Sequence, residues 1–175
     1  QLNDHRKNQF TLEMIHFFEG LGDSIGIALS RRRVESELRE SLDKYRRIVE
    51  TSKEGIWMMD GQQQTTFTNR RMNDMLGYTA EEMMGRNVSS FMFEEDLTDH
   101  AVRMQERAQG IGAVYERRFR RKDGSVLWTI VSASPVLDAQ GRFTGSFGMF
   151  TDLTERKKTE KALRASEARV RAKLD

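Results

Sequence analysis

The stretch from Arg117 to Pro135 predicts two β-strands joined by a tight turn; it runs Arg-Arg-Phe-Arg-Arg-Lys-Asp-Gly-Ser-Val-Leu-Trp-Thr-Ile-Val-Ser-Ala-Ser-Pro. Asp123-Gly124 predicts the turn, because glycine adopts a positive φ without steric cost. Aromatic and β-branched residues, which favour strands, lie on both sides of it. Alternation along the first strand gives one face with two aromatic residues (Tyr115, Arg117 and Phe119) and one charged face (Glu116, Arg118 and Arg120). The pattern predicts half of an antiparallel sheet with one oily face.

The composition restricts the class of protein. The chain has 175 residues, 32% of them charged and 37% hydrophobic, and we expect long solvated helices outside a single compact core. A net charge of only +2 argues against a dedicated nucleic-acid binder. Because there is no cysteine, disulfides, cysteine-ligated metals and thiol chemistry are excluded. Neither a membrane-spanning apolar run nor a signal-peptide pattern is present, so we expect a cytoplasmic protein with no membrane contact in this fragment.

The N-terminal segment predicts a helix whose apolar stripe changes phase. From Phe10, apolar and small residues recur at steps of three and four (Ile15, Phe18, Gly22, Ile25 and Leu29). After Arg31–Arg33 the stripe resumes in a new phase (Val34, Leu38, Leu42, Tyr45 and Val49). An interrupted heptad of this length is typical of a coiled-coil connector between domains. A single long helix packed on its own domain is the alternative.

The middle of the chain predicts a compact region of short elements. Besides the hairpin, strands are expected at Gly55–Asp60, Gln64–Asn69 and Phe143–Thr151, and helices at Arg70–Leu76, Thr79–Gly85 and Glu94–Gln109. Asn69 is placed to cap the first helix and Gly77 to end it. Thr79 and Glu82 have the spacing of a capping box at the start of the second helix.

From Glu155 the pattern is helical again, with Leu163, Val170 and Leu174 at seven- and four-residue steps. Five residues of the N-terminal connector recur here at a constant offset: Glu35, Leu38, Arg39, Ser41 and Arg46 correspond to Glu160, Leu163, Arg164, Ser166 and Arg171. A repeat that begins here implies that another copy of the domain follows in the full protein. Chance similarity between two charged helices is the alternative.

The order of two strands, three short helices and three antiparallel strands resembles that of a PAS domain. The local sequences resemble the landmarks of that family at Phe67-Thr-Asn69, Leu76-Gly-Tyr-Thr-Ala-Glu-Glu82, Gly85-Arg86, Arg121-Lys-Asp-Gly124 and Asp152-Leu-Thr-Glu-Arg156. The resemblance implies an α+β fold, in which a five-stranded antiparallel sheet carries short helices on one face and long helices flank the domain. It also implies a module that senses a small ligand, light or redox state, or that simply dimerises, and passes strain to an output enzyme.

The opening helix, from Phe10 to Leu29, resembles the last helix of a GAF domain. We therefore expect a GAF-like helix over residues 1–33, a connector helix over 34–50, the PAS domain over 51–154 and a linker helix leading to a further module over 155–175.

His100 is the sharpest candidate for binding a cofactor. Its position is similar to that of the haem-ligating histidine in oxygen-sensing PAS domains, and a neutral imidazole can ligate haem iron. The chain departs from that group, because His100-Ala-Val-Arg103 replaces His-Asp-x-Tyr and Tyr115 stands where the distal arginine is expected. We therefore expect a surface histidine without a ligand. Without cysteine, light-driven cysteine adducts are excluded, whereas non-covalent flavin stays an alternative.

The residues that could form a ligand pocket are Trp57, Met59, Met75, Tyr115 and Val131, and a packed core is the alternative interpretation. No catalytic set emerges, because the carboxylates at helix starts are explained by capping and no phosphate-binding glycine loop is present. We expect no metal site, an unknown cofactor, and a regulatory fragment whose output enzyme lies outside it.

The outer face of the sheet, with Trp128 and Ile130, is expected to need a cover. We expect the amphipathic helix of Leu38, Leu42, Tyr45 and Val49, from the same chain or a partner, to cover it and form a homodimer. A signal would then shift the exit helix at Asp152, Leu153 and Thr154. The expected function is a sensory and dimerisation module for an output domain such as a histidine kinase. Alternatives are a haem or flavin sensor and a regulatory module of a diguanylate cyclase.

Overall fold

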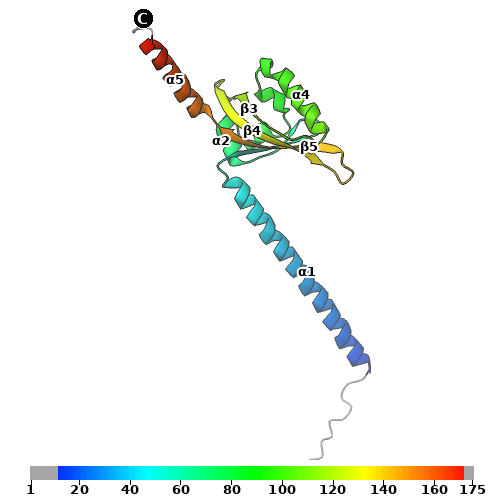
Figure 1. The fold of residues 1–175 in the computed structure, drawn as a ribbon. Coiled ribbons are helices and arrows are strands. Elements are labelled where there is room, and N and C mark those ends of the chain that lie inside the picture. The colour runs from blue at the N-terminus through cyan, green and yellow to red at the C-terminus, as the bar shows by residue number, and fades with distance from the viewer. Residues whose placement is uncertain (1–11, 172–175) are drawn as a thin grey trace, which may run out of the picture. The chain divides into compact units, whose positions relative to one another are not determined.

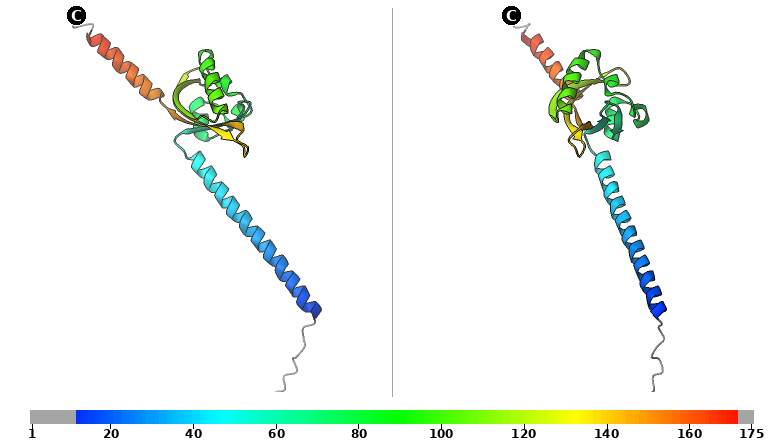
Figure 2. Two further views of the ribbon diagram at one scale, coloured as in Figure 1. Left: turned by 45° about the vertical axis from the view of Figure 1, so that its right-hand side comes forward. Right: turned by 90° about the vertical axis from the view of Figure 1, so that its right-hand side faces the viewer.

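The computed structural model describes residues 12–171, and its centre is a five-stranded antiparallel sheet in the order β2-β1-β5-β4-β3. The short helices between β2 and β3 lie on one face of this sheet (Figures 1 and 2). In chain order, the elements are α1 (Leu12–Glu50), β1 (Gly55–Asp60), β2 (Thr65–Thr68), α2 (Arg70–Leu76), α3 (Ala80–Met83), the 3₁₀ turns η1 (Val88–Phe91) and η2 (Glu94–Asp96), α4 (Leu97–Ala108), β3 (Ala113–Arg120), β4 (Val126–Leu137), β5 (Phe143–Asp152) and α5 (Thr154–Arg171). The predicted PAS-like architecture is confirmed.

The chain divides into two units between Arg47 and Ile48. Most of α1 belongs to the first unit, where it continues without a break through the predicted boundary at residue 33, supported by pairs such as Arg31–Glu35 (2.9 Å). Many of its apolar side chains are exposed, among them Phe18, Ile25, Leu29, Leu38, Leu42 and Tyr45. The predicted helix start at Phe10, the heptad position Leu174 and the side chains of Ile15 and Val170 lie outside the described part of the chain. No helix in the described range 12–171 has the length and apolar character needed to cross a membrane.

The hairpin of β3 and β4 forms as its sequence predicts. Gly124 adopts φ 80°, and Asp123 Oδ1 accepts hydrogen bonds from the backbone N–H (2.9 Å) and hydroxyl (2.6 Å) of Ser125. The register pairs Tyr115 with Val131 and Phe119 with Leu127. Inward-facing side chains of both strands are therefore brought to the same face of the sheet.

The hydrophobic core lies between the inner face of the sheet and the short elements α2, α3 and η1. Its buried members are Trp57, Met72, Met75, Leu76, Met83, Val88, Phe91, Met92, Phe119, Leu127, Val131, Ala133 and Phe150. The Trp57 ring lies at its centre, 5.2 Å from the Phe91 ring and 5.8 Å from the Phe150 ring. Its indole N–H donates to the Thr65 hydroxyl at 3.0 Å, so the one polar group of the ring is satisfied.

Asn69 joins three segments at the entry to the domain. Its side-chain oxygen accepts from the backbone N–H of Met72 (2.9 Å) and of Ile56 (2.8 Å). Its side-chain nitrogen donates to the carbonyls of Val49 and Glu54, both at 3.0 Å. The predicted cap is confirmed, as are the left-handed Gly77 after α2 (φ 77°) and the capping box at α3.

Two features of the helical side differ from the prediction. The helix expected over 94–109 begins as the 3₁₀ turn η2, in which Asp96 N–H donates to the Phe93 carbonyl, and only then continues as α4. The turn η1, which buries Val88 and Phe91, was not expected, because so short a segment lacks a complete helical period.

Candidate functional site

A small cavity lies between α4 and the inner face of the sheet, with a volume of about 30 Å³. Its wall includes the predicted pocket residues Trp57, Met59, Tyr115 and Val131, together with His100. Met75 is not part of the wall; it is buried in the core instead. Polar groups enter the cavity from α4, β3 and β5, namely His100, Arg107, Tyr115, Arg117 and Ser146.

His100 is buried, with 6% of its surface exposed, so the prediction of a surface histidine is wrong. The reason is the unusual inner stripe of α4, on which His100, Met104 and Arg107 face the sheet at helical spacing. Its Nδ1 lies 2.9 Å from Arg117 Nη1 and its Nε2 lies 2.9 Å from Gln63 Oε1. Because a guanidinium can only donate, the imidazole proton belongs on Nε2, where it donates to Gln63.

Burial, together with the charges of Arg117 and Arg107, lowers the pKa of His100 from 6.5 to about 4, against the opposing effect of Asp99. The imidazole is therefore neutral at physiological pH. Gln63, its second partner, has a left-handed backbone (φ 63°), which is uncommon for a residue other than glycine. The turn between β1 and β2 thus brings a polar side chain to α4.

Three arginines surround the ring of Tyr115. The guanidinium carbons of Arg103, Arg107 and Arg117 lie 5.0, 5.9 and 4.9 Å from the ring centroid. None of these arginines is predicted from the sequence to line the pocket. On sequence grounds Arg103 enters only as a residue beside His100, and Arg117 only as part of the strand face that carries two aromatic residues. Two features of the sequence could have indicated this cluster. His100, Arg103 and Arg107 have helical spacing, and Arg117 alternates with the aromatic residues on the inner face of a strand.

The partners of these arginines differ. Arg117 is 5% exposed and contacts both the carboxylate of Asp99 and His100. Arg103 lies near Glu106 (3.2 Å) and Asp99 (3.8 Å). Arg107 is 4% exposed and, among residues 12–171, bonds only to neutral atoms, the Tyr115 hydroxyl and the Met104 sulfur (3.3 Å). Burial lowers the pKa of Arg107; contact with Tyr115 opposes this shift, and Arg117 and Arg103 add to it.

Haem and flavin do not fit this arrangement. A haem ligand needs a free imidazole nitrogen, but Arg117 and Gln63 occupy both nitrogens of His100. The cavity holds two or three water-sized groups, since one such group needs about 10–15 Å³, whereas cofactor pockets measure hundreds of Å³. Within the described residues, no group of His, Asp and Glu side chains could hold a metal ion.

A row of residues crosses the sheet from the cavity to the start of α5. Register pairs Arg117 of β3 with Thr129 of β4, and Thr129 with Asp152 of β5. The buried Thr129 hydroxyl donates to the Arg117 carbonyl at 2.9 Å. Beside this row, Leu153 N–H donates to the Trp128 carbonyl (2.7 Å). The residues predicted to transmit a signal thus lie where the sheet ends and α5 begins.

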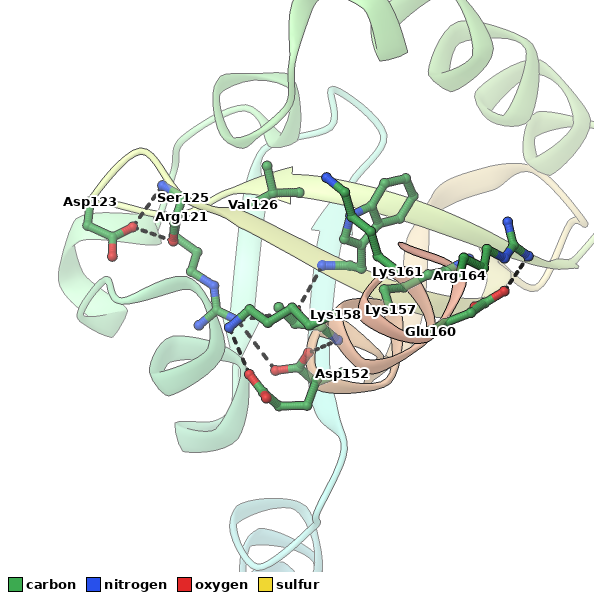
Figure 3. A pocket seen from close by; sticks show the side chains of 13 residues that line it. Arg121, Asp123, Ser125, Val126, Asp152, Lys157, Lys158, Glu160, Lys161 and Arg164 are labelled. Atoms are coloured by element: carbon green, nitrogen blue, oxygen red, sulfur yellow. Dashed lines mark hydrogen bonds and ion pairs between the residues drawn. The ribbon is translucent and has the colours of Figure 1, made fainter. Parts of the chain in front are cut away.

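Side chains fasten the start of α5 to the sheet. Arg121 lies 3.5 Å from the Asp152 carboxylate, and both side chains line a broad groove of about 960 Å³ beside α5 (Figure 3). Lys157 lies 2.7 Å from Glu116 and 5.5 Å from the centroid of the Trp128 ring. Glu116 and Arg117 are adjacent in β3. The first side chain faces α5, and the second faces the cavity.

The outer face of the sheet is apolar near its centre. Trp128 and Ile130 lie there half-buried, with Met58, Phe147 and Met149 on the neighbouring strands. Of the other predicted interface residues, Leu38, Leu42 and Tyr45 are 59%, 56% and 64% exposed, and Val49 is half-buried.

This architecture, with a small polar cavity under α4 and a helix that leaves the end of the central strand β5, is that of a PAS-type domain. Residues 43–153 match the family described as PAS fold, and the chain belongs to the PAS family. The chain therefore carries a PAS domain, a sensory domain that acts in signal transduction.

Several curated relatives are similar to this chain. The C4-dicarboxylate transport sensor protein DctS of Rhodobacter capsulatus is 29% identical over 143 residues, which cover 80% of this chain and 22% of that protein. Sporulation kinase C of Bacillus subtilis is 25% identical, over 74% of this chain and 30% of that protein. The probable diguanylate cyclase DgcE of Escherichia coli is 26% identical, over 74% of this chain and 12% of that protein. The chain thus spans less than a third of the length of each of these relatives.

Solved structures share the fold. The PAS domain of a Colwellia psychrerythraea protein has a TM-score of 0.60 at 21% identity, covering 65% of this chain and 98% of that chain. An RNA-binding light-oxygen-voltage receptor has a TM-score of 0.60 at 26% identity, covering 70% of this chain and 36% of that chain.

Proposed function

We propose that this chain is a sensory and dimerisation module of a cytoplasmic signalling protein, and that it relays a change in the cavity under α4 to an output domain through α5. The row of Arg117, Thr129 and Asp152 carries the proposal. Its first member forms part of the cavity wall, and its last member precedes the exit helix by two residues. A ligand that moves Arg117 relative to Thr129 would shift the strand end that positions α5.

Dimerisation would give this shift a second helix to act against. An exposed stripe of Leu38, Leu42 and Tyr45 has the spacing of a coiled-coil seam, and the outer face of the sheet around Ile130 is apolar. We assign both surfaces to a second copy of the chain, in a parallel homodimer with the α1 helices paired. A pair of exit helices can then change between two packing arrangements.

The output domain that we favour is a histidine kinase outside this chain, and names such as sporulation kinase C support this choice. The similarity to the probable diguanylate cyclase DgcE supports a cyclase as the second candidate. In either case the chain itself would act as a regulator without catalytic activity, with a small molecule as its ligand and no nucleic-acid partner.

Because the chain has no cysteine, one introduced thiol gives a unique labelling site. Ser166→Cys in α5 would carry a nitroxide, and pulsed electron paramagnetic resonance would measure the distance between the labels of two copies. We expect a defined distance distribution, which Arg117→Met shifts because it removes the bonds to Asp99 and His100. Arg118→Met is the matched control, since that side chain points to the other face and bonds to Asp96 (2.8 Å).

Circular dichroism would establish that each variant is folded. Absence of any dipolar signal at high protein concentration would contradict dimerisation. An identical distribution in the folded Arg117→Met variant, or the same shift in Arg118→Met, would contradict the relay.

A further inference from the structure

Arg107 is a buried cation for which the described residues supply no carboxylate partner. It is 4% exposed, and its terminal nitrogens bond to the Tyr115 hydroxyl and the Met104 sulfur. Within the described residues, its buried Nε has no hydrogen-bond partner, and no acidic group forms an ion pair with it. Burying an unpaired charge is costly, and proteins keep such a group where something else compensates for it.

The other charges around the cavity do not neutralise Arg107. The described acidic groups near it are Asp99, which contacts Arg117 and Arg103, and Glu106, which contacts Arg103. Both lie toward solvent on α4, with side chains 59% and 36% exposed. Since His100 is neutral at physiological pH, three arginines face two carboxylates, and one positive charge remains inside.

We propose that the cavity binds the carboxylate of a short monocarboxylic acid, held by Arg107 together with Tyr115 and Arg117. This deepens the proposed sensory function, on which it rests for its biological meaning. A guanidinium presents two parallel N–H groups that match the oxygens of a carboxylate, and such charge-assisted bonds are the strong ones. The hydroxyl of Tyr115 accepts from Arg107, its ring lies 4.9 Å from the guanidinium carbon of Arg117, and its own O–H can donate to the same anion.

The size and the opposite wall of the cavity restrict the rest of the ligand. About 30 Å³ accommodates two or three water-sized groups, which is about the size of a carboxylate group itself and leaves little room for an alkyl chain. Trp57, Val131 and Ala133 make this wall apolar in part, and the flexible Met59 can move to admit the methyl or ethyl group of the acid. A dicarboxylate would have to bury its second charge against this wall, so acetate and propionate fit better than succinate.

Isothermal titration calorimetry on the whole chain can test this, with sodium acetate and propionate as probes at constant ionic strength. Acetamide is the neutral counterpart of acetate, and sodium chloride controls for salt. We expect saturable binding of acetate or propionate, none of acetamide, and succinate binding at least about tenfold weaker. The proposal would be overturned if neither acetate nor propionate showed saturable binding up to about 50 mM, or if acetamide bound as tightly as acetate.

Variants locate the site. Arg107→Met should weaken binding of the tighter monocarboxylate by at least about tenfold, because it removes the charged donor while it keeps a flexible apolar stem. It should still fold, since it removes an unpaired buried charge. Arg103→Met, one turn away on the same helix, is the matched control and should change the affinity by less than about threefold, because Arg103 is paired with Glu106. Equal losses in the two folded variants would overturn the role of Arg107.

The same samples separate this ligand from the relay. If acetate binds but hydrogen exchange at residues 152–160 does not change, the ligand assignment stands and the relay fails. If Arg117→Met changes α5 while neither monocarboxylate binds, the relay stands and the ligand class is wrong.

Discussion

The inner face of the sheet has two ends of opposite chemistry. Under α2, α3 and η1, Trp57, Leu76 and Phe91 belong to a core in which the one indole N–H is satisfied. Under α4, the same face meets His100, Arg107 and Arg117, which are equally buried. Close-packed apolar contacts stabilise the first end, whereas desolvated cations reduce the stability of the second. The difference indicates that one end maintains the fold and the other is adapted to a ligand.

The buried residues of the helices that cover the two ends, α2 and α4, differ in the same way. α2 buries Met72, Met75 and Leu76, as a helix that covers a core should. α4 buries His100, Met104 and Arg107, so two of its three buried residues are ionisable. A local departure from the usual apolar stripe is typical of a functional site.

Phe91→Ala should produce the largest loss of stability at the apolar end. The ring is fully buried and lies 5.2 Å from the rings of Trp57 and Tyr78. Truncation leaves a cavity and should lower the free energy of unfolding by about 3–5 kcal/mol. Urea denaturation would measure this, and Phe93→Ala at a half-buried position is the control. A loss below about 1 kcal/mol would mean that the end under η1 is not the main source of stability.

The polar end should instead show itself in the dependence of stability on pH. The pKa of His100 is about 4 in the folded chain and 6.5 ordinarily. The unfolded chain therefore binds the proton more readily, and the stability contributed by neutral His100 is complete above pH 6.5 and is lost as pH falls toward 4. Between pH 7 and pH 4.5 this loss amounts to about 2 kcal/mol. The groups that face the imidazole are Arg117, Arg107, Asp99 and Gln63.

Comparison with His100→Gln isolates this contribution, because glutamine can still bond to Gln63 or Arg117 but does not titrate. Urea denaturation at pH 7, 5.5 and 4.5 should show a fall for the wild type that exceeds the fall for the variant by about 2 kcal/mol. Parallel curves would mean that the imidazole is more exposed to solvent than the contacts of α4 imply.

Local signals made most of the fold predictable. Asp123-Gly124 fixed the hairpin, and Asn69, Gly77 and Thr79 marked helix ends, because turns and caps depend on residues that are adjacent in the chain. The alternation of Tyr115 with Phe119 placed the inner face for the same reason.

The polar end could not be predicted in this way, because its contacts join distant segments. His100 bonds to Gln63, 37 residues earlier, and to Arg117, 17 residues later. From the sequence alone, a histidine on a charged helix resembles a surface residue. Only the folded structure shows that a turn and a strand supply partners for both of its ring nitrogens. Arg107 was missed for the opposite reason, since its significance lies in a carboxylate partner that the described part of the chain does not supply.

The smallest expected effect tests whether the polar end communicates with α5. Lys157→Gln removes the contacts with Glu116 (2.7 Å) and the Trp128 ring (5.5 Å) that fasten α5 to the sheet. Since exposed ion pairs contribute about 0–1 kcal/mol, global stability should hardly change. Amide exchange in the first turns of α5 should nevertheless accelerate by about two- to fivefold, because this local opening is opposed by few other contacts.

Lys158→Gln is the matched control, since in the described part of the chain Lys158 pairs only with Glu155 of its own helix (2.8 Å). It should leave the exchange of residues 154–160 within about 1.5-fold of the wild type, because helical pairs of this kind contribute little. If both variants accelerate exchange equally, the effect belongs to the helix itself, and the sheet does not hold α5. If only Lys157→Gln does so, the sheet holds the start of α5 through Glu116. Glu116 is next to Arg117 of the cavity wall, so adjacent residues of β3 would then connect the polar end of the sheet to the exit helix.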